Sequence, residues 1–330
     1  GLMAPTEILA KQHFNLALKT FKEFNIKIEL LTGKTESKNK KIILEKLRTK
    51  KIDFLIGTHA LFQKKVEFQK LGLIIIDEQH KFGVRQRMNL AKKGGDNCDV
   101  LLMSATPIPR TMMMSIYGDM DVSKITEKPL NRKEVVTLSK PENKIGEIIN
   151  FIKKKIDIKE QVFWVCPLID ESSKLDFSST MKKFDYINKI FPNKVGIIHG
   201  SLTENEKQLV LSKFLNKEIL ILVSTTVIEV GIDFPNATVI VIENANKFGL
   251  AQLHQLRGRI GRGKKSGTCI LLFKGNLSQN AKKRIKILKQ YNDGFFIAEQ
   301  DMKLRGFGDI IGFKQSLSLI HISEPTRRYS

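Results

Sequence analysis

Hydrophobic and polar positions along the chain form two alternating patterns. One is a series of short runs of Ile, Leu and Val with few polar interruptions, which is typical of strands buried on both faces of a parallel sheet. These runs predict strands at Ile26–Leu31, Phe54–Gly57, Leu73–Ile76, Val100–Met103, Val162–Cys166, Val195–Ile198, Ile219–Ser224, Val239–Ile242 and Thr268–Phe273. The other is a series of amphipathic stretches, which predict helices over Thr6–Phe24, Ser37–Lys50, Lys144–Lys155 and Glu204–Asn216. Alternation of strands and helices predicts an α/β doubly wound fold with parallel sheets.

The alternation occurs twice, which predicts two domains. The first set of elements finishes near Val122, and the proline-containing segment Ser123–Pro141 is interpreted as a linker. The second set finishes near Lys274. The chain then becomes basic and helical over Leu277–Tyr291, and a second short helix follows Gly294. We therefore expect domains at residues 1–135 and 136–275, a helical hairpin and glycine-rich motif at 276–316, and a tail at 317–330.

The charge balance points to a polyanionic partner. Lys and Arg number 56 against 34 Asp and Glu, a formal net charge of +22 in 330 residues. Such an excess suits nucleic acid, which is the first candidate partner. The alternative is a Lys-rich background composition, because Lys, Ile and Asn are all abundant.

Cysteine spacing and hydropathy exclude several classes of protein. Cys98, Cys166 and Cys269 are far apart, so they have neither the short spacing of a zinc site nor the even number of a disulfide framework. A reducing cytoplasm fits this usage. The longest apolar runs have the length of strands rather than the ~20 residues of a membrane span.

The block Gln252–Gly263 concentrates arginine in a chain that otherwise prefers lysine. Arg257, Arg259 and Arg262 are separated by glycines. A guanidinium group is planar and grips phosphate oxygens with two hydrogen bonds, so the block predicts an arginine finger for a nucleotide phosphate. We expect the glycines to let the backbone approach a ligand. The alternative is a basic helix end on the surface.

An acidic pair follows a predicted buried strand. Leu73–Ile76 leads directly into Asp77, Glu78, Gln79 and His80. Ligand sites of α/β folds lie at the carboxyl ends of the strands. An aspartate there can hold Mg²⁺ through water, and the next glutamate can orient and deprotonate an attacking water. The tetrad therefore predicts phosphoryl-transfer chemistry.

Hydroxyl residues follow two other predicted strands. Ser104 and Thr106 come after Val100–Met103 and could relay hydrogen bonds between the acidic pair and the second domain. Thr225 and Thr226 follow Ile219–Ser224 and could bind phosphate oxygens of a nucleic-acid backbone. Asp233, in the same segment, could hold a ribose or pair with an arginine.

In chain order, the motifs PTE, GTH, DEQH, SAT, TTVIEVGID and QLRGRIGR resemble the motor core of superfamily-two helicases. The resemblance implies two RecA-like domains that close on ATP and Mg²⁺. It implies Mg²⁺ binding and water activation by Asp77 and Glu78, and it leaves Arg257 on a variable position. The other implied catalytic or nucleotide-binding residues are His80, Gln255, Gly231, Asp233, Arg259 and Arg262, and the implied contacts with the DNA backbone are Pro5, Thr6, Gly57, Thr58, Thr225 and Thr226.

Longer stretches are similar to a narrower family. DEQHKFGVRQR, MSATPIPRT, VCPLIDESSKLD and ENANKFGLAQLHQLRGRIGRG resemble the RecG helicases, which migrate branched DNA in recombination and repair. GFFIAEQDMKLRGFGDIIGFKQS resembles the translocation motif that they share with the transcription-repair coupling factor. Coupling roles are implied for Ser104, Thr106, Arg305, Gly306, Gly308, Asp309 and Gln315. The coupling factor remains an alternative, whereas the RGFGDIIG stretch disfavours an RNA helicase. A monomer in the cytoplasm is expected.

The phosphate-binding loop GxxxxGK[ST] does not occur in the sequence. Gly33-Lys34-Thr35 lacks the first glycine, and Gly258 to Lys264 is followed by Lys265 rather than Ser or Thr. We therefore expect a first domain truncated at its start and no wedge domain. We also expect no appreciable ATPase activity from these residues alone. The alternative function is therefore a module that binds DNA without hydrolysing ATP. Residues 317–330 have no helical or strand period and are interpreted as a non-native tail.

Overall fold

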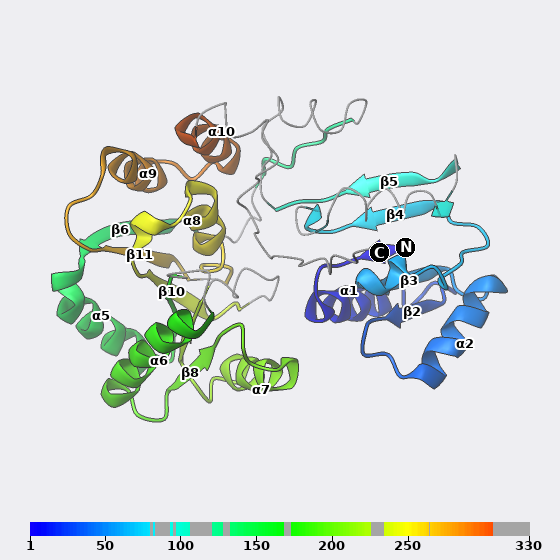
Figure 1. Ribbon diagram of the computed structural model, residues 1–330, viewed down its shortest axis with the longest axis horizontal. Coiled ribbons are helices and arrows are strands. Elements are labelled where there is room, and N and C mark those ends of the chain that lie inside the picture. Colours follow the sequence, from blue (N-terminus) through cyan, green and yellow to red (C-terminus); the bar gives the residue numbers. More distant parts are fainter. Residues whose placement is uncertain are drawn as a thin grey trace, which may run out of the picture.

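A computed structural model of the chain describes residues 1–79, 82, 93–94, 97–105, 121–127, 133–167, 173–225, 234–263 and 265–305. The described strands form two parallel sheets, each covered by helices, and Figure 1 shows them as two separate layered bodies. This confirms the predicted α/β class with two doubly wound domains.

The first sheet has the strand order β2-β3-β1-β4-β5. Its strands are β1 (Leu2–Met3), β2 (Ile28–Leu31), β3 (Phe54–Gly57), β4 (Leu73–Ile76) and β5 (Asp99–Leu102), and its helices are α1 (Glu7–Thr20), α2 (Ser37–Arg48) and the 3-10 turn η1 (His59–Phe62). Side chains of α1 pack on one face with Leu2 and Ile56, and those of α2 pack on the other with Met3 and Leu55. Successive strand residues point to opposite faces, so both faces carry a core.

The second sheet has the strand order β6-β11-β10-β7-β9-β8. Its strands are β6 (Val135–Pro141), β7 (Gln161–Val165), β8 (Val195–Ile198), β9 (Ile221–Ser224), β10 (Ala237–Ile242) and β11 (Gly267–Phe273). Its helices are η4 (Glu142–Lys144), α5 (Ile145–Asp157), α6 (Ser173–Ile190), α7 (Glu204–Leu215), η6 (Ala245–Lys247), α8 (Leu250–Arg257), α9 (Gln279–Gln290) and α10 (Gly294–Arg305).

The sheet separates two hydrophobic cores. In β7, Val162 and Trp164 face the core formed with α5 and α6, whereas Phe163 and Val165 face the core formed with α7, α8 and α9. All four of these side chains have no exposed surface. A strand buried on both faces has no polar alternation, which is why its sequence is a continuous apolar run.

The prediction of a linker over Ser123–Pro141 is wrong for the last part of that segment. Val135–Pro141 is β6, which pairs along its whole length with β11 and forms an edge of the second sheet. Val136 and Leu138 are more than a third exposed, and Lys140 and Pro141 interrupt the apolar pattern. An edge strand covered on one side tolerates polar residues and proline, so its sequence resembles that of a loop.

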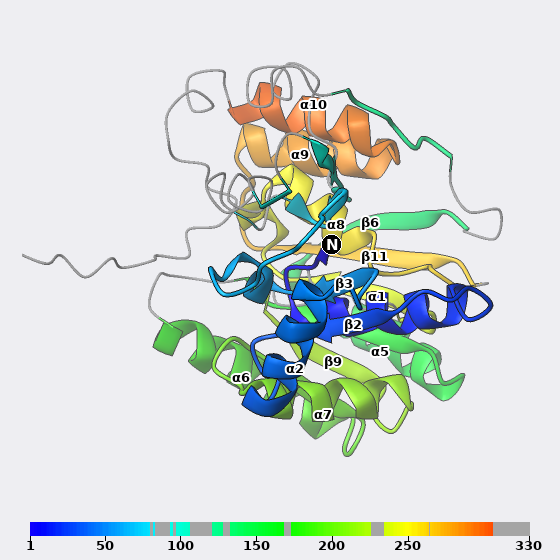
Figure 2. The same ribbon diagram turned by 90° about the vertical axis from the view of Figure 1, so that its right-hand side faces the viewer.

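Helix α9 corresponds to the predicted basic helix and α10 to the predicted short helix after it, and Figures 1 and 2 both show them beside α8. Asp301 of α10 accepts a hydrogen bond from the Leu250 amide at 3.1 Å. It thereby caps the start of α8, whose N-cap residue Gly249 makes no side-chain cap. Arg284 of α9 donates to the carbonyls of Asn246 and Phe248. Within the described part of the chain, no helix is both long and apolar enough to cross a membrane.

Candidate functional site

Four neighbouring strands of the first sheet end at one edge, and each end carries predicted site residues. The strands β3, β1, β4 and β5 are parallel, so their carboxyl ends lie side by side. Gly57 and Thr58 lie at the end of β3, Pro5 and Thr6 after β1, Asp77 and Glu78 after β4, and Ser104 after β5. The sheet therefore places the candidate DNA contacts beside the acidic pair.

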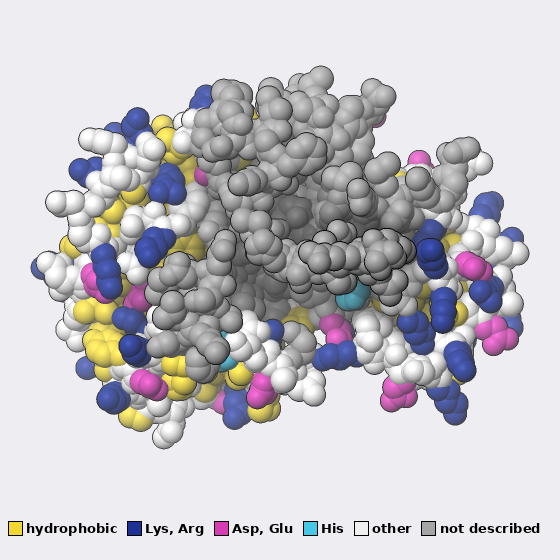
Figure 3. Space-filling view, in the orientation of Figure 1, with side chains coloured by type: hydrophobic (Ala, Val, Ile, Leu, Met, Phe, Trp, Pro, Cys, Tyr) yellow, Lys and Arg dark blue, Asp and Glu magenta, His cyan; other side chains and the backbone are white. Residues whose placement is uncertain are grey.

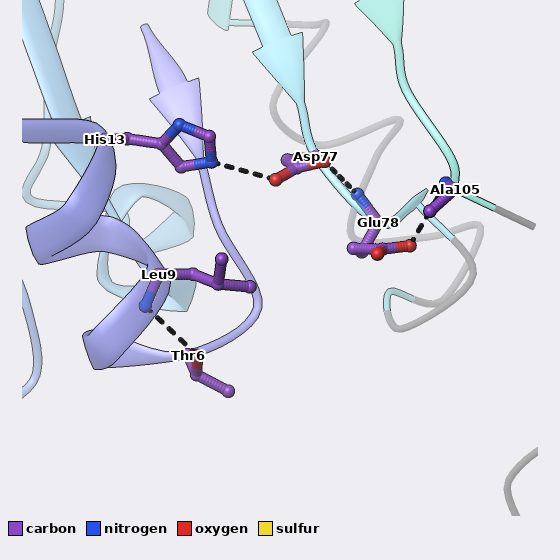
Figure 4. A network of polar contacts seen from close by, with 6 residues as sticks. All are labelled: Thr6, Leu9, His13, Asp77, Glu78 and Ala105. Carbon is purple, nitrogen blue, oxygen red and sulfur yellow. Dashed lines mark hydrogen bonds and ion pairs between the residues drawn. The ribbon is translucent and has the colours of Figure 1, made fainter. Parts of the chain in front are cut away.

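The acidic pair has a defined geometry (Figure 4). Asp77 accepts two hydrogen bonds: Oδ1 from the Glu78 amide at 2.9 Å and Oδ2 from His13 Nε2 at 2.8 Å. Glu78 Oε2 accepts from the Ala105 amide at 3.4 Å, which joins the ends of β4 and β5. Glu78 has a φ of 47°, in the left-handed region that glutamate seldom adopts. Such strain often accompanies functional sites.

The candidate DNA contacts of the first domain also serve the fold. Thr6 is the N-cap of α1, and its Oγ1 accepts from the Leu9 amide at 3.4 Å. A Cβ atom at Gly57 would clash with the Leu31 carbonyl oxygen, so the tight spacing of β2 and β3 requires glycine there. Thr58 is only 4% exposed, and its hydroxyl has no hydrogen-bond partner among the described residues. A buried hydroxyl of this kind suits an external acceptor such as phosphate.

The corresponding edge of the second sheet carries a matching threonine. Thr225 follows β9, is 3% exposed, and its hydroxyl likewise has no partner among the described residues. Its amide donates to the Ile198 carbonyl at 3.3 Å, which brings it beside the end of β8. His199 follows β8 and is also buried. Burial and then the charge of Lys207 lower the pKa of His199, although Glu206 opposes them.

The arginine block begins in α8 and continues into the loop before β11. Arg259 is 8% exposed, and Arg262 and Gln255 are partly exposed. Arg262 Nε donates to the Gly258 carbonyl at 3.0 Å. Asp77 follows β4 of the first sheet, whereas Arg259 and Arg262 follow α8 of the second domain.

Arg257 has a structural role within the second domain. It is 4% exposed, and its Nη1 donates to the carbonyls of Leu288 at 2.6 Å and Tyr291 at 3.1 Å, at the end of α9. Its Nη2 lies 2.9 Å from His254 Nδ1. Burial lowers the pKa of Arg257, with Cys269 opposing. Arg257 therefore anchors α9 to α8.

The glycines of the block serve the fold of the chain itself. Gly261 has a φ of 67°, and its amide donates to the Ala237 carbonyl at 3.1 Å. A Cβ atom at Gly263 would clash with the Pro235 carbonyl oxygen. These two glycines therefore allow close packing of the loop against the segment around the start of β10, and the approach of glycine backbone to a ligand stays a prediction.

The oxygen donors fit a hydrated Mg²⁺ rather than a metal caged by protein ligands. Among the described residues no group of three or more His, Cys, Asp or Glu could hold a metal ion. Mg²⁺ usually keeps several waters and binds to one or two carboxylates together with substrate phosphates. Asp77 and Glu78 supply this set, and each oxygen of Asp77 keeps a second lone pair for a metal-bound water.

Both parts of the chain are similar to known helicases. The DEAD/DEAH box helicase model matches residues 2–115, and the helicase conserved C-terminal domain model matches residues 143–264. The ATP-dependent DNA helicase RecG of Bacillus subtilis is 46% identical over 318 residues, which cover 96% of this chain. RecG of Thermotoga maritima is 49% identical over 317 residues.

This chain belongs to the RecG family of helicases. A solved structure of RecG bound to a three-way DNA junction is 45% identical, covers 93% of this chain and has a TM-score of 0.77. The yeast helicase Dbp5, 18% identical with a TM-score of 0.64, shares the fold. The chain spans 46% of the length of the Bacillus subtilis RecG and 40% of the Thermotoga maritima RecG.

Several residues assigned from the two helicase resemblances lie outside the described residues: His80, Thr106, Thr226, Gly231, Asp233, Gly306, Gly308, Asp309 and Gln315. Arg305 is the last residue of α10. Sequence reasoning missed His13, His199 and Arg257. A signal for His13 existed, because it lies two helical turns after Thr6 and so on the same face of the predicted helix. Nothing in the sequence marks His199, and the arginine block marks Arg257 but not its structural role.

Proposed function

We propose that this chain is the motor core of an ATP-dependent DNA helicase or translocase that acts on branched DNA in recombination and repair. One observation carries the proposal: a single sheet edge brings Thr58, Thr6, Asp77, Glu78 and Ser104 together in the order of its strands. The names of the RecG relatives and the junction-bound RecG structure support ATP dependence and DNA as the substrate.

In this proposal each residue has a distinct task. Asp77 holds Mg²⁺ through water, and Glu78 orients the attacking water and takes its proton. Arg259 and Arg262 stabilise charge on the transferred phosphoryl group, and Gln255 couples the arginine block to the nucleotide. Mg²⁺ when bound neutralises phosphate charge. Asp233 and Gly231 would border the nucleotide.

The proposed DNA contacts go to the backbone. Thr58 and Thr225 have buried hydroxyls without partners among the described residues, and Pro5 and Thr6 lie between Thr58 and the acidic pair. Figure 3 shows Lys and Arg side chains spread over both ends of the visible face, where Asp and Glu are fewer. Backbone contacts of this kind carry no sequence information. We infer a monomeric, cytoplasmic protein.

The test is ATP hydrolysis by the protein expressed from its complete reading frame, measured with forked, duplex and single-stranded DNA. We expect forked DNA to stimulate hydrolysis most. Glu78→Gln should lower kcat by at least ~100-fold while leaving DNA affinity unchanged, because it removes the base and keeps the shape. Stronger stimulation by single-stranded DNA would contradict the proposal.

A DNA-binding module without turnover is the second candidate, and the absence of a phosphate-binding loop in these residues favours it for the 330-residue chain alone. This chain should bind duplex DNA but hydrolyse no ATP. Robust hydrolysis that disappears in Glu78→Gln would eliminate this candidate.

A further inference from the structure

The contact between His13 and Asp77 joins the acidic pair to a helix outside the predicted nucleotide motifs. His13 lies on α1, and its Nε2 donates to Asp77 Oδ2 at 2.8 Å. The two side chains are 25% and 18% exposed, so water screens the contact only in part. Figure 4 shows the imidazole pointing from α1 directly at the carboxylate.

Helix α1 holds His13 rigidly. Thr6 caps its start, and Leu9, Ala10 and Ala17 are buried against the sheet. His13 therefore approaches Asp77 from a packed element rather than from a loop. Sites supported by packed elements keep their geometry more tightly than sites on loops.

The two hydrogen bonds on Asp77 fix its carboxylate in one orientation. The Glu78 amide holds Oδ1 and His13 holds Oδ2. Each oxygen has two lone pairs, so each keeps one that can accept from a metal-bound water. Without His13, Oδ2 loses the hydrogen-bond partner that it has among the described residues, and the carboxylate can turn about its side-chain bonds.

We propose that His13 is a positioning residue that orients Asp77 toward Mg²⁺ bound with the nucleotide. The assignment rests on the proposed function. In this role His13 acts through its hydrogen bond to Asp77. Groups that orient a metal-binding side chain typically contribute 10- to 100-fold to metal affinity or activity.

The experiment measures binding of a fluorescent, non-hydrolysable ATP analogue to the protein expressed from its complete reading frame, in Mg²⁺ and in EDTA. His13→Leu should weaken binding in Mg²⁺ by ~10-fold and leave binding in EDTA unchanged. His13→Gln, whose amide nitrogen can still donate to Asp77, should recover most of the loss. Gln12→Leu, at an exposed position of the same helix, is the matched control and should bind as the unsubstituted protein does.

A second set of variants separates positioning from a general loss of structure. In an Asp77→Asn background, His13→Leu should have no further effect on Mg²⁺-dependent binding, because the group through which it acts is gone. Circular dichroism checks that each variant folds. If His13→Leu does not fold, His13→Gln keeps the test decisive.

Three results would overturn the assignment: equal binding by His13→Leu and Gln12→Leu, an equal loss in EDTA, or an undiminished loss in the Asp77→Asn background. If the unsubstituted protein shows no Mg²⁺-dependent binding, the proposed function fails and the assignment fails with it. Mg²⁺-dependent binding that is indifferent to His13 refutes the assignment alone.

Discussion

Replacing Arg257 should destabilise the second domain strongly, although Arg257 lies in the arginine block and not among the proposed fingers. Arg257 is 4% exposed, and its guanidinium donates two hydrogen bonds to the carbonyls at the end of α9. Hydrogen bonds to a charged group contribute about 1.5–3 kcal/mol each, part of which is offset by the cost of burying the charge. We expect Arg257→Met to lower the free energy of unfolding by about 3 kcal/mol.

The sole tryptophan gives a direct assay. Trp164 is fully buried in β7, so its fluorescence reports unfolding of the second domain and not of the first. A loss of about 3 kcal/mol should lower the melting temperature of a domain of this size by roughly 6–12 °C. Lys286→Met, on the exposed side of α9, makes the same kind of change without a buried partner and is the control.

Variants at Arg257 should differ in stability according to the hydrogen bonds that they keep. Arg257→Lys keeps a charge but loses the planar fork, so it should fall between the unsubstituted chain and Arg257→Met. If Arg257→Met melts within ~1 °C of Lys286→Met, a difference worth less than about 0.5 kcal/mol, the two hydrogen bonds contribute nothing to stability and the anchoring role is refuted.

Two further predictions concern buried polar groups. Burial opposes the charge of Glu160, but hydrogen bonds from Thr238, Lys265 and Lys155 outweigh it and hold the pKa of the carboxyl below 4.5. The stabilisation is therefore present above pH 4.5 and is lost as the pH falls through the lowered pKa of Glu160. Glu160→Gln should destabilise the domain by about 1–3 kcal/mol at pH 7. A stability difference between the variant and the unsubstituted protein that is as large in acid as at pH 7 would contradict this. Thr58→Val and Thr225→Val should leave stability unchanged or slightly raised, because the hydroxyls have no partner among the described residues. Each substitution should nevertheless weaken duplex DNA binding about 5-fold at fixed salt. An unchanged affinity for DNA would show that these threonines do not belong to the interface.

The order of the strands in each sheet could not be predicted from the sequence. Runs such as Phe54–Gly57, Leu73–Ile76 and Val195–Ile198 are observed with the predicted bounds, because buried strands need uninterrupted apolar residues. The short β1, however, inserts between β3 and β4 and so places Thr6 next to Asp77. Pairing between strands separated by dozens of residues leaves no local pattern.

The contacts that support the site were equally hidden. His13 reaches Asp77 across 64 residues of sequence, and Asp301 caps α8 across 51. Such partners depend on which helix packs beside which strand end. A histidine or an aspartate on a polar helix face looks the same in sequence whether it meets water or a distant partner.

By itself, the sequence determined the fold class, the position of the acidic pair at a strand end and the identity of the arginine block, because these depend on local apolar period and residue chemistry. The tertiary structure decided what each side chain does within that frame. In the structure Arg257 binds the end of α9, Gly261 and Gly263 allow close packing, and His13 contacts Asp77. The physical reason is that burial and hydrogen-bond partners are properties of packing between distant segments, and local sequence does not encode them.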